Sequence, residues 1–146
     1  MAEAALMDDY VQMDAVDWVD FPQGLCAGWV QWKLLHVSPE TGSWTAAFKA
    51  AKGASIARHT HVGPGEYYMT KGRMLVRGGS DEGGETAVAP AYGYEACNAR
   101  HDYTFFEEDS ELYMTFLGPL NFTDDDDNTI ALVGWRQVYD AWNASA

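Results

Sequence analysis

Apolar residues along most of this chain occur in short runs, and turn-forming residues separate one run from the next. The separators are clusters rich in Gly, Pro, Glu, Asp and Ser, such as residues 39–42, 78–84 and 90–93, and such clusters mark turns. Many short strands at this spacing are typical of an antiparallel barrel or sandwich. The pattern therefore predicts an all-β fold, with strands near residues 30–37, 43–50, 66–70, 73–77, 86–89 and 112–117.

The end of the chain has a helical pattern instead. Trp135, Val138, Tyr139 and Trp142 follow the spacing i, i+3, i+4, i+7, which aligns apolar side chains on one face of a helix. We expect a short C-terminal helix that packs this face on the barrel. The 146 residues have the length of one domain. We expect residues 1–146 to form a single domain in which residues 1–16 are a loosely ordered N-terminal segment or arm.

Composition and charge narrow the classes of partner. The chain is 14% aromatic, which suits an interior filled with large rings. Its formal net charge of -13 repels phosphate backbones and anionic lipid, so we expect no nucleic acid and no membrane partner. The first residues lack the basic and long apolar regions of a signal peptide. Because Cys26 and Cys97 are far apart and make no disulfide scaffold, we interpret them as reduced thiols in a cytoplasmic protein.

Four consecutive aspartates, Asp124 to Asp127, lie between two apolar segments. A calcium loop needs alternating ligands and a central glycine, and this run has neither. We therefore expect a solvated hairpin turn here rather than a calcium site.

The histidines carry the first indication of chemistry. His36 is alone in a strand just before a turn, and we expect it to be structural or solvated. His59 and His61 are two residues apart, so on one strand both imidazoles point to the same face. Two imidazoles on one inward face form half of a transition-metal site.

The residues around these histidines resemble the two motifs of the cupin superfamily. Segment 53–72 has the first glycine, the His-x-His and the closing glycine of the first motif. Segment 90–101 has the Pro-x-x-Gly and the later histidine of the second. That histidine follows the glycine by eight residues where two are usual, and the extra loop could bring polar side chains to the mouth of the site. The resemblance implies a single-domain cupin, a small antiparallel β-barrel or jelly roll, with the metal ligands His59, His61 and His101; the alternative is a cupin fold with a vestigial site.

One departure from the cupin pattern concerns the usual glutamate, which lies seven residues before the turn glycine Gly72. That position is Gly65, and Glu66 comes one residue late. A shift of one residue on a strand turns a side chain to the opposite face, so Glu66 should point away from the metal and Tyr67 should point inward. The site is then three neutral histidines without a carboxylate, unless a bulge at residues 63–65 returns Glu66 to the interior.

Longer blocks of sequence carry a more specific resemblance. They are residues 31–37, 41–46, 62–67, 70–74, 76–79, 92–95 and 116–122. Together they resemble the acetylacetone-cleaving, β-diketone dioxygenase branch of the cupins, over nearly the whole chain from residue 17 to residue 142. The resemblance implies a mononuclear non-haem iron(II) site, with zinc or another divalent metal as the other possible occupant, and a homo-oligomer, either a tetramer or a dimer.

The same resemblance extends to residues beside the metal ligands. We expect Tyr67, Arg77 and Glu95 to form a polar catalytic group, with Arg77 and Glu95 as an opposite-charge pair, because buried charges need a partner. Alternatively, Arg77 tethers the loop of residues 78–84. Three apolar residues are candidates for lining the substrate site, or are plain core: Ile56, Leu112 and Phe116.

The activity implied is the cleavage of a carbon–carbon bond of a β-diketone, such as acetylacetone, with O2 to give a carboxylic acid and an α-dicarbonyl. A β-diketone binds as an enolate anion through two oxygens, and three neutral imidazoles leave a metal its full charge for that anion. Two alternatives stay open at this point. One is a zinc-binding cupin sensor or binding module, and the other is a related cupin dioxygenase that acts on a hydroxy-aryl ketone.

Overall fold

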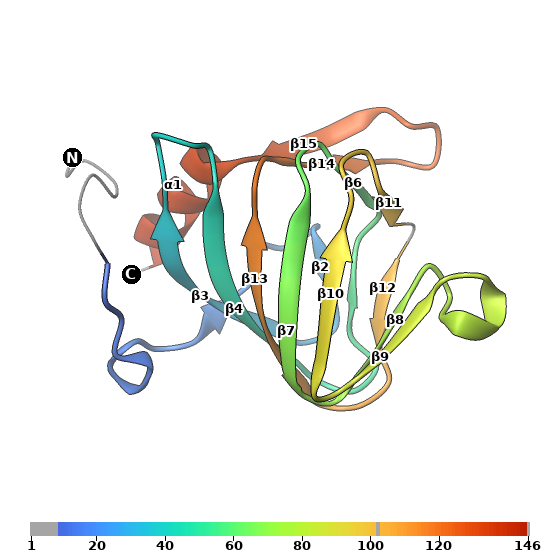
Figure 1. Cartoon of the computed structure of the whole chain (residues 1–146). Coiled ribbons are helices and arrows are strands. Elements are labelled where there is room, and N and C mark those ends of the chain that lie inside the picture. The colour runs from blue at the N-terminus through green and yellow to red at the C-terminus, as the bar shows by residue number, and fades with distance from the viewer. Residues whose placement is uncertain (1–8, 102, 146) are drawn as a thin grey trace.

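The computed structural model describes residues 9–101 and 103–145, and it contains three antiparallel sheets (Figure 1). The largest has the strand order β1-β3-β4-β13-β7-β10. Its strands are β1 (Val19–Asp20), β3 (Val30–Val37), β4 (Trp44–Ala50), β13 (Ser110–Phe116), β7 (Gly65–Lys71) and β10 (Ala91–Glu95). This sheet forms one wall of a barrel, and the two smaller sheets close it.

The second sheet has the order β11-β6-β14-β15 and the third has the order β2-β5-β12-β8-β9. The strands of the second are β11 (Arg100–His101), β6 (His59–His61), β14 (Leu120–Thr123) and β15 (Thr129–Val133). Those of the third are β2 (Cys26–Ala27), β5 (Ser55–Ile56), β12 (Thr104–Phe106), β8 (Arg73–Val76) and β9 (Glu85–Val88). Two 3-10 turns, Met13–Ala15 and Ser80–Glu82, complete the elements before the C-terminal helix. The cupin fold expected from the sequence is confirmed.

Large rings fill the space between the sheets, as the aromatic content predicts. Trp32, Trp44, Phe106 and Phe122 are almost fully buried. Trp44 and Phe116 stack with their ring centroids 3.9 Å apart. Along β7, inward and outward residues alternate, which is the period that turns one face of a strand to the core.

The C-terminal helix α1 (Trp135–Ser145) is confirmed where the apolar spacing predicts it. Val138 is buried, and Trp142 packs edge-on against Trp32 with 5.4 Å between ring centroids. No helix in the part of the chain that the structure describes is long and apolar enough to cross a membrane.

The expected N-terminal arm of residues 1–16 lies partly outside the described residues, which begin at residue 9. Within the described part, the Lys33 side chain donates a hydrogen bond of 2.7 Å to the carbonyl oxygen of Met13. His36 Nδ1 lies 2.5 Å from a carboxylate oxygen of Asp9. Residues 9–16 therefore contact β3 at two points.

The six strands predicted from the sequence are present, as β3, β4, β7, β8, β9 and β13. Strand β10 was missed, because Pro90 and Gly93 suggest a turn. Gly93 serves a different purpose. A Cβ at this position would lie 2.6 Å from the hydroxyl oxygen of Tyr67 and closer still to two carbons of its ring. The glycine therefore marks a close approach between β10 and β7 rather than a turn.

Candidate metal centre

Three histidines from two neighbouring strands converge inside the barrel. His59 and His61 lie on β6, and His101 lies on β11, directly opposite His59 in the β11–β6 pairing. All three are buried, and one ring nitrogen from each lies within 4.8 Å of the others. The strand parity predicted for His59 and His61 thus brings them together with His101.

The hydrogen bonding of the rings leaves nitrogen lone pairs free for a metal. His59 Nδ1 contacts the carbonyl oxygen of Ala57 at 2.8 Å, so this nitrogen carries the proton and Nε2 keeps its lone pair. Neither ring nitrogen of His61 has a hydrogen-bond partner, and neither has Nε2 of His101. Buried polar atoms without partners are costly, and a divalent cation would satisfy one nitrogen of each ring. The residues present therefore fit a divalent metal.

Burial also sets the protonation state of the three rings. It lowers the pKa of His59, and it lowers the pKa of both His61 and His101 to about 3, with the charge of His59 adding to the effect. Neutral imidazole is the form that binds metals. The three rings are therefore in their binding form at neutral pH.

Glu95 brings a carboxylate to the edge of this site. It ends β10, opposite Gly65 of β7. Its carboxylate oxygens lie 3.0 Å from His101 Nε2 and 3.4 Å from His61 Nε2. Neither contact has hydrogen-bond geometry, since both nitrogens lack a hydrogen-bond partner. Burial raises the pKa of Glu95 to about 7, and the positive charge of Arg77 opposes part of that rise.

Glu66 points away from the histidines, as strand parity predicts. It is exposed on the outer face of β7, where the Tyr92 hydroxyl donates a hydrogen bond to it. Gly65 takes the inward position, and a Cβ there would lie 3.3 Å from Nδ1 of His61. The register shift between β7 and β13 lies at residues 111–112, at the far end of the strand. The carboxylate near the histidines is therefore Glu95 and not Glu66.

The other two residues of the expected polar group, Tyr67 and Arg77, differ in burial. Tyr67 is buried, and burial together with the charge of Glu95 raises the pKa of its hydroxyl. Arg77 is exposed, with a φ of 50° that is uncommon outside glycine. Among the described residues Arg77 makes no direct ion pair with Glu95, although both line the same hollow, so the expected pairing of their charges stays a prediction. Its charge reaches Glu95 and His101 only over a longer distance.

An apolar cavity lies beside the histidines, in the interior of the barrel. It is small, with about 60 Å³ open to the centre of a water molecule. The three residues expected to line a substrate site, Ile56, Leu112 and Phe116, all line it, together with His59 and Tyr67. Other lining residues were not expected from the sequence, among them Thr104, Phe106, Met114, Leu120 and Phe122. The alternation of apolar residues after the turn at 118–119 would have indicated the last two.

A second, polar hollow reaches the histidines from the outside. Its lining includes Arg77, Glu95, His101 and Tyr67. Tyr67 thus lines both hollows, and its ring lies between the apolar interior and the polar approach. The arrangement offers a small molecule an apolar pocket, a candidate metal site and one buried hydroxyl group.

The comparisons with known proteins agree with this geometry. The sequence profile of the ChrR cupin-like domain family matches residues 6–121. The acetylacetone-cleaving enzyme of Acinetobacter johnsonii is 52% identical over 138 residues, which cover 94% of this chain and 90% of that enzyme. The crystal structure of an acetylacetone dioxygenase from Acinetobacter johnsonii has a TM-score of 0.93 at 50% identity and covers 100% of this chain and 98% of that one. The crystal structure of a proposed acetylacetone dioxygenase from Methylibium petroleiphilum PM1 has a TM-score of 0.92 at 56% identity. It covers 97% of this chain and 99% of that one. The chain therefore belongs to the ChrR cupin-like family, in the same branch of the cupins as the acetylacetone-cleaving enzymes.

Proposed function

We propose that this protein is an iron(II)-dependent dioxygenase that cleaves a carbon–carbon bond of a β-diketone such as acetylacetone. The products are a carboxylic acid and an α-dicarbonyl. The observation that carries the proposal is the buried, neutral three-histidine cluster, of which His59 lines an apolar cavity and His101 lines a polar hollow. Its support is the 52% identity to an acetylacetone-cleaving enzyme over 94% of the chain.

His59, His61 and His101 are the proposed metal ligands. Iron(II) held by them would supply a Lewis acid for the two oxygens of the enolate and a redox-active centre for dioxygen. The apolar lining, with Ile56 and Leu112, would receive the alkyl groups of the substrate. The cavity also keeps bulk water away from the reacting carbon.

Tyr67 and Arg77 have separate proposed roles. The Tyr67 hydroxyl, whose pKa burial raises further above its usual value, is protonated at neutral pH and can donate a hydrogen bond to a substrate oxygen. The protein as a whole has a formal net charge of -13, which repels an anionic enolate. The exposed guanidinium of Arg77 at the polar hollow would attract that anion and offset the charge of Glu95.

Assembly and location belong to the same proposal. The family resemblance supports a homo-oligomer, a tetramer or a dimer. The outer face of the largest sheet presents Tyr68, Tyr92 and Tyr113, and in the strand pairing Tyr68 is opposite both of the others. Exposed aromatic residues in a row suit an interface between copies. Two free cysteines support a reducing, cytoplasmic location.

The experiment that tests the activity compares metal forms of one preparation. Protein prepared without oxygen is loaded with iron(II) or with zinc, and oxygen uptake is followed with a panel of β-dicarbonyls. The iron form should consume oxygen and the zinc form should not, because zinc has no redox chemistry. Full iron occupancy without oxygen uptake on any β-dicarbonyl would favour a zinc-type binding module or a dioxygenase for another ketone.

A further inference from the structure

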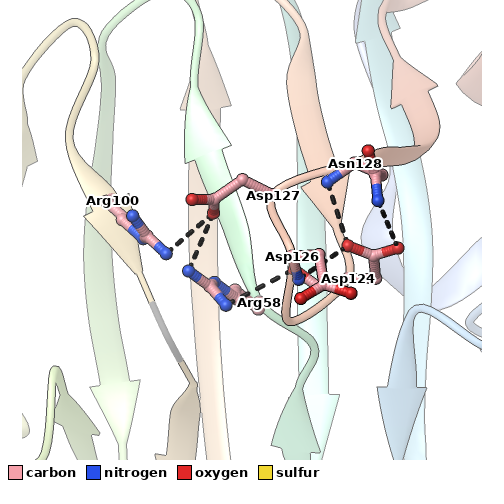
Figure 2. Close-up of polar contacts among 6 residues, drawn as sticks. All are labelled: Arg58, Arg100, Asp124, Asp126, Asp127 and Asn128. Carbon is pink, nitrogen blue, oxygen red and sulfur yellow. Dashed lines mark hydrogen bonds and ion pairs between the residues drawn. The ribbon is translucent and has the colours of Figure 1, made fainter.

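The acidic hairpin between β14 and β15 is confirmed as a turn, and it has a defined internal structure (Figure 2). The Asp124 carboxylate accepts hydrogen bonds of 2.9 Å from the backbone N–H groups of Asp126 and Asn128. The Asp127 N–H donates to the Asp124 carbonyl oxygen at 3.1 Å. Asp127 has a φ of 64°, in the left-handed region where Asp and Asn are tolerated best among side-chain-bearing residues. The turn therefore fixes the backbone from which the Asp127 side chain extends.

That carboxylate bridges two arginines, one just before β6 and one on β11. One oxygen, Oδ1 of Asp127, accepts a hydrogen bond of 2.9 Å from Arg58 and another of 2.8 Å from Arg100 (Figure 2). Arg58 immediately precedes His59, and Arg100 immediately precedes His101. Both arginines have further contacts. Oδ1 of Asp127 is a single atom that contacts both of them.

The bridge spans the sheet that carries the histidines. In the order β11-β6-β14-β15, the hairpin that carries Asp127 lies on one side of β6 and β11 lies on the other. Side chains alternate along a strand, so Arg100 lies on the face of β11 opposite to the inward His101. The Arg58 guanidinium, from the residue just before β6, meets that of Arg100 on the same side at Asp127 Oδ1. Asp127 thus joins, from outside, the two backbone positions next to His59 and His101.

Strand β11 is short, and the loop before it is tied to the end of β6 by backbone hydrogen bonds and by the Cys97 thiol, which donates to the carbonyl oxygen of Val62 at 2.9 Å. The strand contributes two residues, with Arg100 opposite Thr60 and His101 opposite His59. Two backbone hydrogen bonds link the preceding turn to His61, from His61 N–H to Ala99 at 2.9 Å and from Asn98 N–H to His61 at 2.6 Å. Any motion of so short a strand would separate His101 from the other two imidazoles. Metal binding would then have to bring the three imidazoles back together, which lowers the affinity.

We propose that Asp127 is a positioning residue of the metal centre. By holding Arg58 and Arg100 together on the outer face, it holds His59 and His101 at metal-binding separation on the inner face. This inference rests on the proposed function only in that the three histidines bind a divalent metal. Asp127 and Arg100 are half-exposed, and Arg58 is mostly buried. Two partly exposed ion pairs are worth roughly a 3- to 10-fold change in metal affinity.

The test uses redox-silent metals, so that affinity is measured without catalysis. The dissociation constants of Zn²⁺ and Co²⁺ are determined by competition with a chelator for the wild type, Asp127→Asn, Asp127→Glu and Asp125→Asn. Asn keeps the size and the backbone preference of Asp127 and removes only the charge. Asp125 is exposed in the same turn, and its side chain makes no hydrogen bond or ion pair with the residues that the structure describes. Asp125→Asn is therefore the matched control for net charge.

The expected result is a loss of roughly 3- to 10-fold in metal affinity for Asp127→Asn and a partial recovery for Asp127→Glu. Asp125→Asn should stay within about twofold of the wild type, since an unpaired exposed charge contributes little. The gap between the wild type and Asp127→Asn should shrink at about 1 M salt, where the Debye length is ~3 Å. The absorption spectrum of the Co²⁺-saturated variant should match that of the wild type, because the ligands are unchanged.

Several outcomes would overturn the proposal. Wild-type affinity in Asp127→Asn would do so, even with a lower thermal stability, because the hairpin would then be structural only. An equal loss in Asp125→Asn would assign the effect to net charge. If Asp127→Asn fails to fold, Arg100→Gln takes its place, and unchanged affinity there counts against the bridge. A wild type that binds neither metal would end this inference and the proposed function together. If the wild type binds both metals and only Asp125→Asn has an altered affinity, this inference alone would end.

Discussion

Gly93→Ala is the substitution that tests most sharply how the fold shapes the site. The new Cβ would lie 2.6 Å from the Tyr67 hydroxyl oxygen and nearer still to two ring carbons. Ordinary contacts between such atoms are about 3.5–4.0 Å, so the ring has to move by roughly 1 Å. Gly93 does not have a positive φ, so the clash with the ring, and not backbone strain, causes the effect.

Two losses of different size should follow from this displacement. Overpacking a well-filled interior costs about 1–3 kcal/mol of unfolding free energy. Because Tyr67 lines both the apolar cavity and the polar hollow, a shift of that size should lower turnover by up to roughly 100-fold. Metal content should be unchanged, because Tyr67 is not among the three proposed ligands.

The assay combines thermal unfolding, metal content and oxygen uptake on the same samples. Tyr67→Leu removes the ring atoms that clash, so adding Gly93→Ala to that background should cost much less stability than it does in the wild type. Gly134→Ala is the control, since a Cβ there meets its neighbours at 3.3 and 3.5 Å. Wild-type stability and turnover in Gly93→Ala would refute the packing argument, and an equal stability loss in both backgrounds would place its cause elsewhere.

Three further predictions concern the ligands, the two glutamates and the cavity. His101→Ala should reduce metal occupancy sharply. His36→Ala should leave it unchanged, because the His36 ring contacts Asp9 and is not part of the histidine cluster; metal analysis of both variants decides this. Glu66→Gln should leave turnover and metal content near wild type, while Glu95→Gln should lower turnover more than metal content. A loss of turnover in Glu66→Gln would contradict the assignment of the strand faces. Phe116→Ala should lower the free energy of unfolding by about 3–5 kcal/mol and shift the substrate preference toward bulkier β-diketones, and steady-state kinetics on a size series would show whether the cavity selects substrate.

The sequence predicted the local part of the site well. The two-residue spacing of His59 and His61 placed both rings on one face of β6, and the one-residue displacement of Glu66 placed its carboxylate outside. Both conclusions follow from the alternation of side chains along a strand, which needs no knowledge of the partner strands.

Contacts between distant segments were harder to predict. The approach of Glu95 to the histidines depends on the pairing of β10 with β7, and β10 itself was hidden by residues that suggest a turn. The sequence suggested an Arg77–Glu95 pair, but it did not indicate that Arg77 is exposed or that its charge acts on Glu95 without a direct ion pair. The arginine contacts of Asp127 join residues 69 and 27 positions apart, and no local pattern indicates which exposed charges meet.

The central claim is that the three-histidine site performs oxygenolytic cleavage, and isotope labelling of the products tests it most directly. Oxidative cleavage of acetylacetone consumes one O2 and gives acetate and methylglyoxal, whereas hydrolytic cleavage uses water and gives acetate and acetone. With the iron(II)-loaded protein under ¹⁸O2 in unlabelled water, the account predicts acetate that carries one ¹⁸O atom, in an amount equal to the oxygen consumed. Unlabelled acetate accompanied by acetone would contradict it.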